Sequence, residues 1–430
     1  MPTRKPLQTA AAAFSSVILL AQPAFAADAC CKDSCCDDKK DAAFAALTGD
    51  WGGVRSTLKQ NGVELSANYT AELFGNPKGG KKRSIVFDGL LKLTLDVNLD
   101  KTVGWHDASF RMSGLYPHGT SGTLRNVGDA SIFSNIDSYD TVRLIDFWIE
   151  QRLIDDKASI KIGQMRVDDE FGVTDTAAFF VNSTFGIPNP AKTPMPLATY
   201  PVAALGIRLK MEPVKGLYGQ VGIYDGNPSS GDFADPSSKN SVAGSAKRHG
   251  TDWALRSSEG TLYSGEVGFQ RSEGAFPGAY RLGLLRHTDD FADVREGVNA
   301  THSGSTSGYY VIDQTLWQKA EGSKEGVSAF LRGTMADEKT SNMSDTVQVG
   351  AVYTGLLSTE DKLGLAFARN KFSPGQEDQP SRETIVELTY QVPLKPYLRV
   401  QPDLQYISRP GGTSEFNNAW VVGVRATLDF

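Results

Sequence analysis

Long segments in which apolar and polar side chains alternate run through this sequence from residue 62 to its end. In residues 63–73, for example, Val, Leu, Ala and Tyr alternate with Glu, Ser, Asn and Thr. A period of two is the signature of a β-strand with one apolar face. Several segments reach about ten residues, whereas strands of soluble sheets usually have about 5–6, and a tilted strand needs about 9–11 to cross a bilayer. The pattern therefore predicts strands that span a membrane.

No stretch after residue 26 approaches the roughly 20 apolar residues of a transmembrane helix. Only helices and closed barrels satisfy every backbone polar group in lipid. We count about 16 alternating segments, an even number as bacterial barrels have. The predicted fold class is all-β: a transmembrane antiparallel β-barrel of about 16 strands, of the outer-membrane porin type. The predicted strands are centred near residues 67, 95, 110, 147, 160, 207, 221, 267, 284, 312, 329, 351, 365, 388, 400 and 424.

The connections between these strands are predicted to alternate between long and short. Outer-membrane barrels have long extracellular loops and short periplasmic turns, so both chain ends are predicted to lie in the periplasm. The last predicted strand has an apolar residue at every second position and ends with Phe430. Such an end is typical of chains that the barrel-assembly machinery inserts, and this machinery is a predicted partner. The long connections are residues 74–86, 116–141, 164–203, 225–260, 288–307, 335–345, 370–383 and 407–418.

The N-terminus has the features of a secretory signal peptide. Arg4 and Lys5 precede an apolar stretch, and Ala24-Phe25-Ala26 fits the A-x-A cleavage pattern. The predicted location is the outer membrane of a Gram-negative cell. The predicted division is a signal peptide (1–26), a Cys-rich periplasmic tail (27–46), an N-terminal periplasmic segment (47–61) and a transmembrane β-barrel porin domain (62–430).

All four cysteines lie just after the predicted cleavage site. In an oxidising compartment they are expected to form disulfides, within the chain or with a partner. A thiolate metal site is the alternative, but the tail is highly charged and no histidine lies nearby, so we predict no metal site and no cofactor. The role of these cysteines stays open. They are Cys30, Cys31, Cys35 and Cys36.

Charge and motif content limit the functions to consider. The chain has 44 basic and 50 acidic residues, for a net charge of −6, and no basic patch, which argues against nucleic acid as a partner. The motifs G-x-S-x-G, H-E-x-x-H and G-x-x-x-x-G-K-[ST] are absent from the sequence. We therefore predict a protein that is not an enzyme and has no catalytic residues. Two alternatives of other classes are an outer-membrane hydrolase and a surface adhesive or structural barrel with a plugged lumen.

The alternation also predicts which side chains line a water-filled lumen. A charged side chain that faces lipid near the bilayer midplane costs roughly 2–4 kcal/mol, so the charged face of each strand is expected to point inward. By this rule Ile145, Phe147 and Ile149 face lipid. Charged and aromatic side chains suit a sugar, whose hydroxyls pair with charged groups and whose C–H face packs on rings. The lumen residues that we predict to bind substrate are Arg111, Asp146, Trp148, Glu150, Arg166, Asp169, Arg208 and Tyr224.

The longest connection, residues 164–203, is expected to have a function. A loop of this length is usually functional or disordered, and its content of Phe residues argues against disorder. We predict that it folds into the barrel and narrows the pore. The alternative is a lid that packs over neighbouring loops.

Several motifs then resemble one family. Residues 47–55 (LTGDWGGVR), just before the first strand, are similar to the entry motif of the carbohydrate-selective porins of the OprB type. Further similar segments are GLYPHG (114–119), IGQMR (162–166), GIR (206–208) and GIYDGNP (222–228). The resemblance extends over about residues 47–430. It implies a 16-stranded porin that passes glucose and related sugars, with small-molecule sugars and outer-membrane lipid as partners and an unknown oligomeric state. A general porin, or one for another solute, is the alternative.

Overall fold

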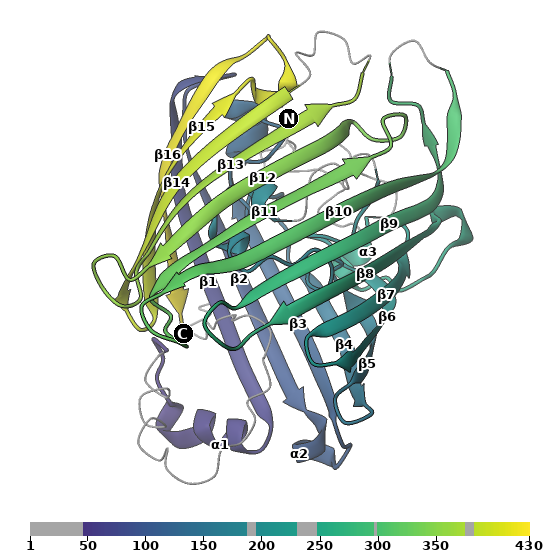
Figure 1. Cartoon of the computed structure of the whole chain (residues 1–430), viewed down its shortest axis with the longest axis vertical. Helices are drawn as coiled ribbons and strands as arrows, with labels where there is room; N and C mark the ends of the chain where they lie inside the picture. Colours follow the sequence, from purple (N-terminus) through teal and green to yellow (C-terminus); the bar gives the residue numbers. More distant parts are fainter. Residues whose placement is uncertain (1–45, 187–194, 230–246, 296–298, 375–381) are drawn as a thin grey trace, which may run out of the picture.

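A computed structural model of the chain describes residues 46–186, 195–229, 247–295, 299–374 and 382–430. Its sixteen antiparallel strands pair in chain order, and the first pairs with the last, which closes a barrel (Figure 1). The predicted all-β fold and the predicted strand number are confirmed. The strands are β1 (Val63–Gly80), β2 (Ile85–Asn98), β3 (Ala108–Gly119), β4 (Arg143–Leu153), β5 (Ala158–Met165), β6 (Ala204–Val214), β7 (Leu217–Asp225), β8 (Thr261–Arg271), β9 (Gly278–Ala292), β10 (Thr301–Gln318), β11 (Gly326–Ala336), β12 (Met343–Thr354), β13 (Lys362–Phe372), β14 (Arg382–Lys395), β15 (Leu398–Ser408) and β16 (Asn417–Asp429).

The described helices are short. None of them is long and apolar enough to cross a membrane. The predicted signal peptide and all but the last residue of the predicted Cys-rich tail lie outside the described residues. The helices are η2 (Trp51–Gly53), α1 (Val54–Gln60), α2 (Leu99–Val103), η3 (Thr123–Val127), η4 (Ala177–Phe179), η5 (Ser183–Phe185), α3 (Lys247–Gly250), η8 (Ser257–Glu259) and η9 (Pro410–Gly412).

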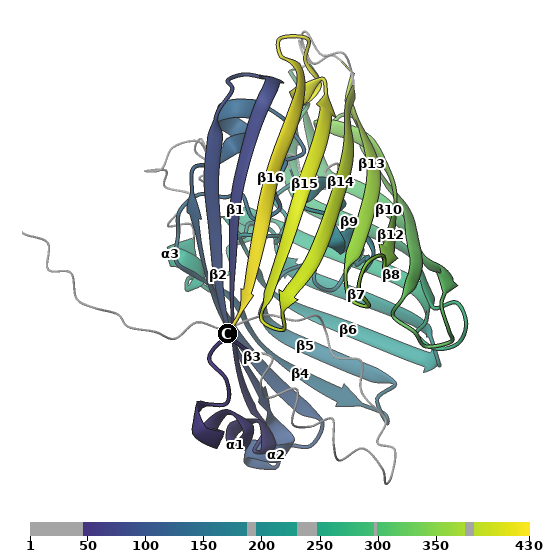
Figure 2. The same ribbon diagram turned by 90° about the vertical axis from the view of Figure 1, so that its left-hand side faces the viewer.

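The segment before β1 is attached to the end of β16. The amide of Leu47 donates to the carbonyl of Asp429 (2.8 Å), and Arg55 of α1 donates to the carbonyl of Phe430 (3.0 Å). The Asp50 carboxylate fixes the start of α1, because it accepts from the backbone N–H of Ser56 at 2.8 Å. Figure 2 shows α1 and α2 at the end of the barrel where β16 ends. Both ends of the described chain therefore meet at one seam.

Three connections at the opposite end are long: residues 120–142, 166–203 and 226–260. The first predicted long connection, 74–86, is wrong in extent, since β1 continues to Gly80 and β2 begins at Ile85. Gly, Asn and Pro interrupt the alternation there, but pairing with β16 continues through two irregularities after Gly75. Similarly, most of residues 288–307 belongs to β9 and β10. Both predicted connections were too long because the strands on either side continue beyond the segments in which apolar and polar residues alternate.

A β-bulge between β3 and β4 overturns one predicted side-chain direction. Ser113 pairs with Asp146, but Gly114 pairs with Leu144, so β4 holds one extra residue at this point. A bulge of this kind shifts the alternation by one residue. Ile145 consequently turns to the lumen side, where it is fully buried against Leu115. The prediction that Ile145 faces lipid was wrong, because alternation alone does not reveal an inserted residue.

Candidate functional site

An ion-pair network joins the inner wall to the start of the connection 166–203. Glu150 of β4 and Glu170 of the connection both accept hydrogen bonds from Arg208 of β6, and both form ion pairs with Lys161 of β5. The Arg208 Nε atom lies 2.8 Å from a Glu170 carboxylate oxygen, and Lys161 Nζ lies 3.4 Å from Glu150. Two carboxylates thus surround two cations, and the four charges are compensated within the network.

Trp148 projects from β4 beside cations from its two neighbouring strands. The guanidinium carbon of Arg111 lies 5.4 Å from the centre of a Trp148 ring, and Lys161 Nζ lies 4.1 Å from it. Arg111 is held in turn by a two-pronged pair with Asp96 of β2, at 2.6 and 3.1 Å. Cations are attracted to the face of an aromatic ring, and a forked Arg–carboxylate pair fixes the guanidinium plane. The indole is therefore oriented by charged neighbours.

Two further ion pairs extend the network toward the end with the long connections. Lys92 Nζ lies 3.7 Å from Asp146, and Arg166 donates to Asp169. Burial lowers the pKa of Arg166, but Asp169, Asp168 and Asp146 raise it by more, so its net shift is upward and it stays charged. The side chain of Asp169 is 42 % exposed, which makes it the most open of these charged groups.

Tyr224 of β7 faces the lumen side but is covered. Only 1 % of the residue is exposed, and its ring makes an edge contact with Phe171 of the connection 166–203. The ring also lies directly over Gly206 of β6, where an added Cβ would come within 2.4 Å of it. Tyr224 therefore supports the wall beneath the connection and offers no surface to a solute.

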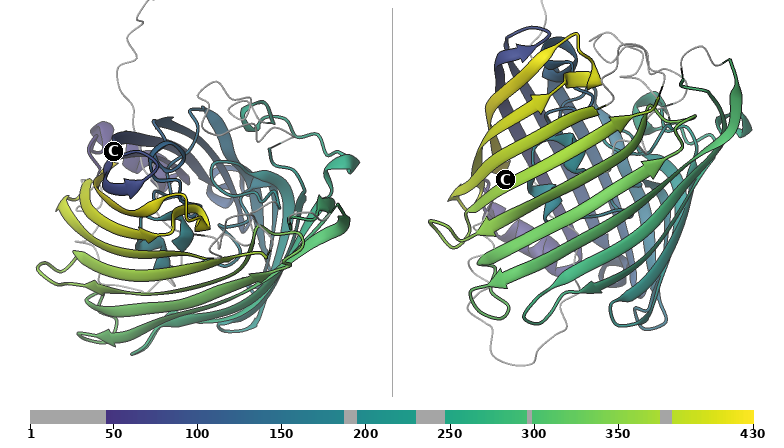
Figure 3. Two further views of the ribbon diagram at one scale, coloured as in Figure 1. Left: turned by 90° about the horizontal axis from the view of Figure 1, so that it is seen from above. Right: turned by 45° about the horizontal axis from the view of Figure 1, so that its top comes forward.

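The described residues of the connection 166–203 lie inside the ring of strands (Figure 3). Three carboxylates of the wall, Glu266, Asp313 and Glu387, accept hydrogen bonds from its backbone N–H groups, with distances that include 2.8 Å from Gly172 to Glu266. On the same side of the barrel, Arg332 of β11 donates to its carbonyl groups. For the described residues these contacts confirm that the connection folds into the barrel. Residues 187–194 of this prediction lie outside the described residues.

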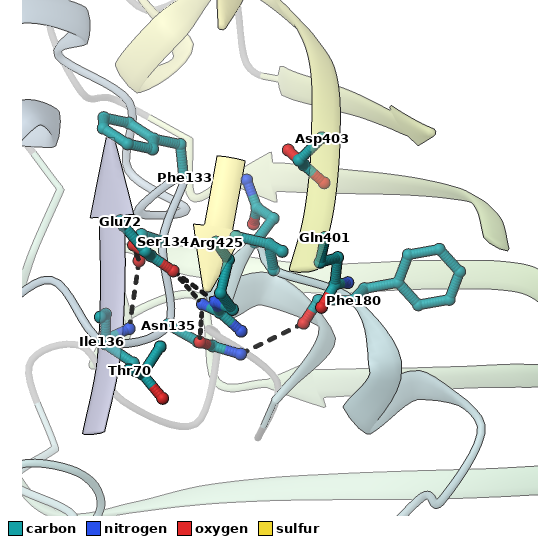
Figure 4. Close-up of polar contacts among 12 residues, drawn as sticks. Thr70, Glu72, Phe133, Ser134, Asn135, Ile136, Phe180, Gln401, Asp403 and Arg425 are labelled. Atoms are coloured by element: carbon teal, nitrogen blue, oxygen red, sulfur yellow. Dashed lines mark hydrogen bonds and ion pairs between the residues drawn. The ribbon is translucent and has the colours of Figure 1, made fainter. Parts of the chain in front are cut away.

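The connection 120–142 is fastened to the seam between β1 and β16. Glu72 of β1 pairs with Arg425 of β16, and Ser134 of the connection donates to the same carboxylate (Figure 4). Asn135 accepts from Arg425 at 2.6 Å and donates to the carbonyl of Phe180 at 3.1 Å. Through Asn135 the two long connections are thus joined to one another and to the wall.

The eight predicted site residues divide into two groups by exposure. Arg111, Trp148, Glu150, Arg166 and Asp169 retain exposed surface, whereas Asp146, Arg208 and Tyr224 are buried behind them. Sequence reasoning left Lys161 and Glu170 out of the site. The alternation could have predicted Lys161, because its neighbours Ile160 and Ile162 are on the apolar face of the strand. The role of Glu170 could not be predicted in this way, because it depends on how the connection folds.

The ion pairs of the network join five cations to five carboxylates, and Asp168 is a further carboxylate that acts on Arg166. In the described part of the chain, no group of three or more His, Cys, Asp or Glu side chains is arranged to hold a metal ion. The cations are Lys92, Arg111, Lys161, Arg166 and Arg208, and the carboxylates are Asp96, Asp146, Glu150, Asp169 and Glu170.

A closed barrel of sixteen strands, with a polar inner wall and a connection folded inside it, defines the outer-membrane porins, a class of channels rather than enzymes. The sequence matches the carbohydrate-selective porin, OprB family over residues 82–430. The chain belongs to this family, and its function is the diffusion of carbohydrates through the barrel in the outer membrane.

Individual relatives agree with this assignment. The chain is 27 % identical to Porin B of Pseudomonas aeruginosa over 89 % of its own length and 91 % of that protein. It is 24 % identical to the putative porin QuiX of Acinetobacter baylyi, over 89 % and 93 % of the two chains. The high-pH structure of Pseudomonas putida OprB superposes with a TM-score of 0.77 at 24 % identity, covering 90 % of this chain and 98 % of that one, which supports the fold.

Proposed function

We propose that the ion-pair network around Trp148 is the sugar path of this porin, and that its solutes are glucose and related small neutral sugars. The pairing of charge carries the proposal: five cations are each paired with carboxylates within one patch of wall, and Asp168 is a further carboxylate beside Arg166. A wall whose cations are all paired with carboxylates gives ions of neither sign a strong electrostatic advantage. It still presents many charged hydrogen-bonding groups to a neutral polyhydroxylated solute.

The exposed members of the network are the proposed contacts. Hydroxyl groups of a sugar pair with Arg111, Glu150, Arg166 and Asp169, whose hydrogen bonds are of the stronger, charge-assisted kind. The half-buried Trp148 packs its exposed part against apolar C–H groups of the sugar ring. The buried residues Asp146, Arg208 and Tyr224 hold these contacts in place. Farther along, the connection 166–203 is bound to β10, β11 and β14, and there it narrows the path.

A liposome-swelling assay tests the proposal. Purified protein in liposomes is exposed to glucose, to larger sugars and to neutral and charged amino acids of similar size. We expect glucose to enter fastest, with rates that fall with sugar size and stay low for charged solutes. Equal rates for glucose and for amino acids of the same size would instead identify a general porin.

The orientation in the membrane is part of the same proposal. We propose that residues 1–26 are removed on export, that residues 27–46 and 47–61 and the C-terminus lie in the periplasm, and that the barrel-assembly machinery inserts the chain into outer-membrane lipid. The protein is proposed to have no enzymatic activity. After replacement of the native cysteines, Ser237→Cys in a long connection should react with an impermeant maleimide on intact cells, and Lys215→Cys should not. The reverse labelling would overturn this orientation.

A further inference from the structure

An apolar groove of about 790 Å³ hollows the outer wall over β6–β11. Outward-facing glycines form part of its floor. A Cβ added at Gly265 would meet no atom within 4 Å, and one at Gly308 would have its nearest neighbour at 3.7 Å. The sides include Leu282, Leu284 and Met335, all of which are strongly exposed. The hollow thus results from missing side chains on the lipid face and not from a gap in the strands.

Aromatic residues bracket the groove along the barrel axis. Toward the long connections, Tyr263 lies two positions before Gly265 on the outer face of β8. Toward the short connections, Tyr280 lies two positions before Leu282 on the outer face of β9, and Tyr310 of β10, which pairs with Leu282, lines this end of the groove. Tyr263 and Tyr280 are 46 % and 44 % exposed. Outward-facing Tyr residues typically lie at the two membrane–water interfaces. The groove therefore lies at the depth of the hydrocarbon layer.

An outward-facing cation, Arg286 of β9, stands at one end of the groove. It lies two residues beyond Leu284 toward the long connections and hence about 7 Å farther along the strand. It donates to the hydroxyl of Thr306 (2.8 Å) and to the carbonyl of Ser303 (2.9 Å). These acceptors are neutral, and Arg286 takes part in none of the ion pairs formed among the described residues. Its charge is thus available to an anion at the interface.

We propose that this groove binds an acyl chain of a phosphorylated membrane lipid, and that Arg286 binds the lipid phosphate. An acyl chain is narrow enough to fill a groove floored by glycines, whereas a second barrel presents a convex wall that would leave the floor empty. A chain in the groove recovers apolar contact, and Arg286 supplies a charge-assisted hydrogen bond at the depth of the headgroup. With the long connections outside, the lipid is lipid A of the outer leaflet.

Native mass spectrometry of the full barrel in mild detergent tests this proposal. The probes are bis-phosphorylated lipid A, dephosphorylated lipid A and phosphatidylethanolamine. We expect one tightly bound lipid A on the native protein. Gly265→Leu should weaken its binding about tenfold or more, because the new side chain occupies the floor. Arg286→Gln should remove a preference of about tenfold for the phosphorylated form.

Gly114→Leu is the matched control. Gly114 also lies on the outer face, on β3, and an added Cβ would have its nearest neighbour at 3.7 Å, but it is outside the groove. This variant should bind lipid A as the native protein does. Glucose flux should be unchanged in all three variants, which keeps the lipid site separate from the sugar path.

Three results would overturn the proposal. Undiminished lipid A binding by Gly265→Leu would exclude the groove as the site. If the native protein forms a dimer and Gly265→Leu dissociates it, the groove binds a second copy of the chain and not a lipid. Equal binding of all three lipids would show that Arg286 does not bind a lipid phosphate and that the groove does not select lipid A.

Discussion

Replacing Glu170 by Gln removes one negative charge from the network and keeps the shape of the side chain. Glu170 and Glu150 together compensate Lys161 and Arg208. In the variant two cations share one carboxylate, so the path gains one net positive charge. The new side-chain amide retains a carbonyl oxygen that accepts from Arg208, and we expect the connection 166–203 to stay in place.

The size of the effect follows from Coulomb's law. A unit charge about 8 Å from an ion in water changes its energy by about 0.5 kcal/mol. That favours an anion about 2.3-fold and disfavours a cation about 2.3-fold, so the anion-to-cation permeability ratio should rise about fivefold. The reversal potential of the channel in a planar bilayer under a KCl gradient measures this ratio. Glucose flux should change less than about twofold, because glucose carries no charge and does not respond to this energy.

Glu273→Gln is the control for this experiment. It also breaks an ion pair, with Lys215, but both side chains are more than three-quarters exposed and lie in short connections outside the lumen. We expect no change in ion selectivity there. If Glu170→Gln folds normally and its reversal potential matches that of the native channel, the network does not line the ion path. A large rise in glucose flux would instead show that Glu170 mainly anchors the connection.

Three further predictions concern the ring, the chain end and one buried carboxyl. Trp148→Ala should raise single-channel conductance and weaken sugar block, by roughly 5-fold or more for about 1 kcal/mol of lost ring contact, whereas Phe147→Leu on the lipid face should change neither; the opposite pattern would invert the assignment of β4. Deleting Phe430 should lower the yield of folded, heat-modifiable barrel in outer membranes, and an unchanged yield on gels would remove this residue from the assembly signal. Burial and the nearby carboxylate of Asp88 raise the pKa of Asp137 to about 7; a raised pKa favours the protonated form in the folded state, so attachment of the connection 120–142 should weaken as the pH rises from about 4 to about 7. Hydrogen exchange corrected for intrinsic rates should show this loss in the native protein and not in Asp137→Asn, and identical profiles would refute it.

The strands were predictable because a strand that crosses a membrane around a polar lumen must alternate apolar outward-facing and polar inward-facing residues. The alternation around Phe147, Trp148 and Ile149 identifies the inward face without knowledge of the partner strand. The same rule failed at Ile145, since a bulge depends on the register between two strands and leaves no mark in either sequence. It would have found Lys161, which lies between two outward Ile residues.

The partners within the lumen were less predictable. Glu170 pairs with Arg208, 38 residues farther along the chain, only because the connection turns back into the barrel. The backbone of this connection donates hydrogen bonds to Glu266, Asp313 and Glu387, which lie on three separate strands. Such pairings depend on the three-dimensional path of a loop, for which the sequence has no periodic signal. The alternation predicted the correct face for Tyr224. It did not predict that Phe171 covers this ring, because that contact also depends on the path of the connection.

The attachment of the N-terminal segment to β16 makes barrel closure dependent on the last residues of β16 and on Phe430. Leu47 and Arg55 bind the backbone of the last two residues, and β1 pairs with β16 along most of its length. These are the contacts with the greatest separation in sequence, and contacts of this kind form slowly. A chain that lacks its final residues leaves the first strand with an open edge and the N-terminal segment without acceptors. The end of β16 is therefore a condition for sealing the barrel at this seam.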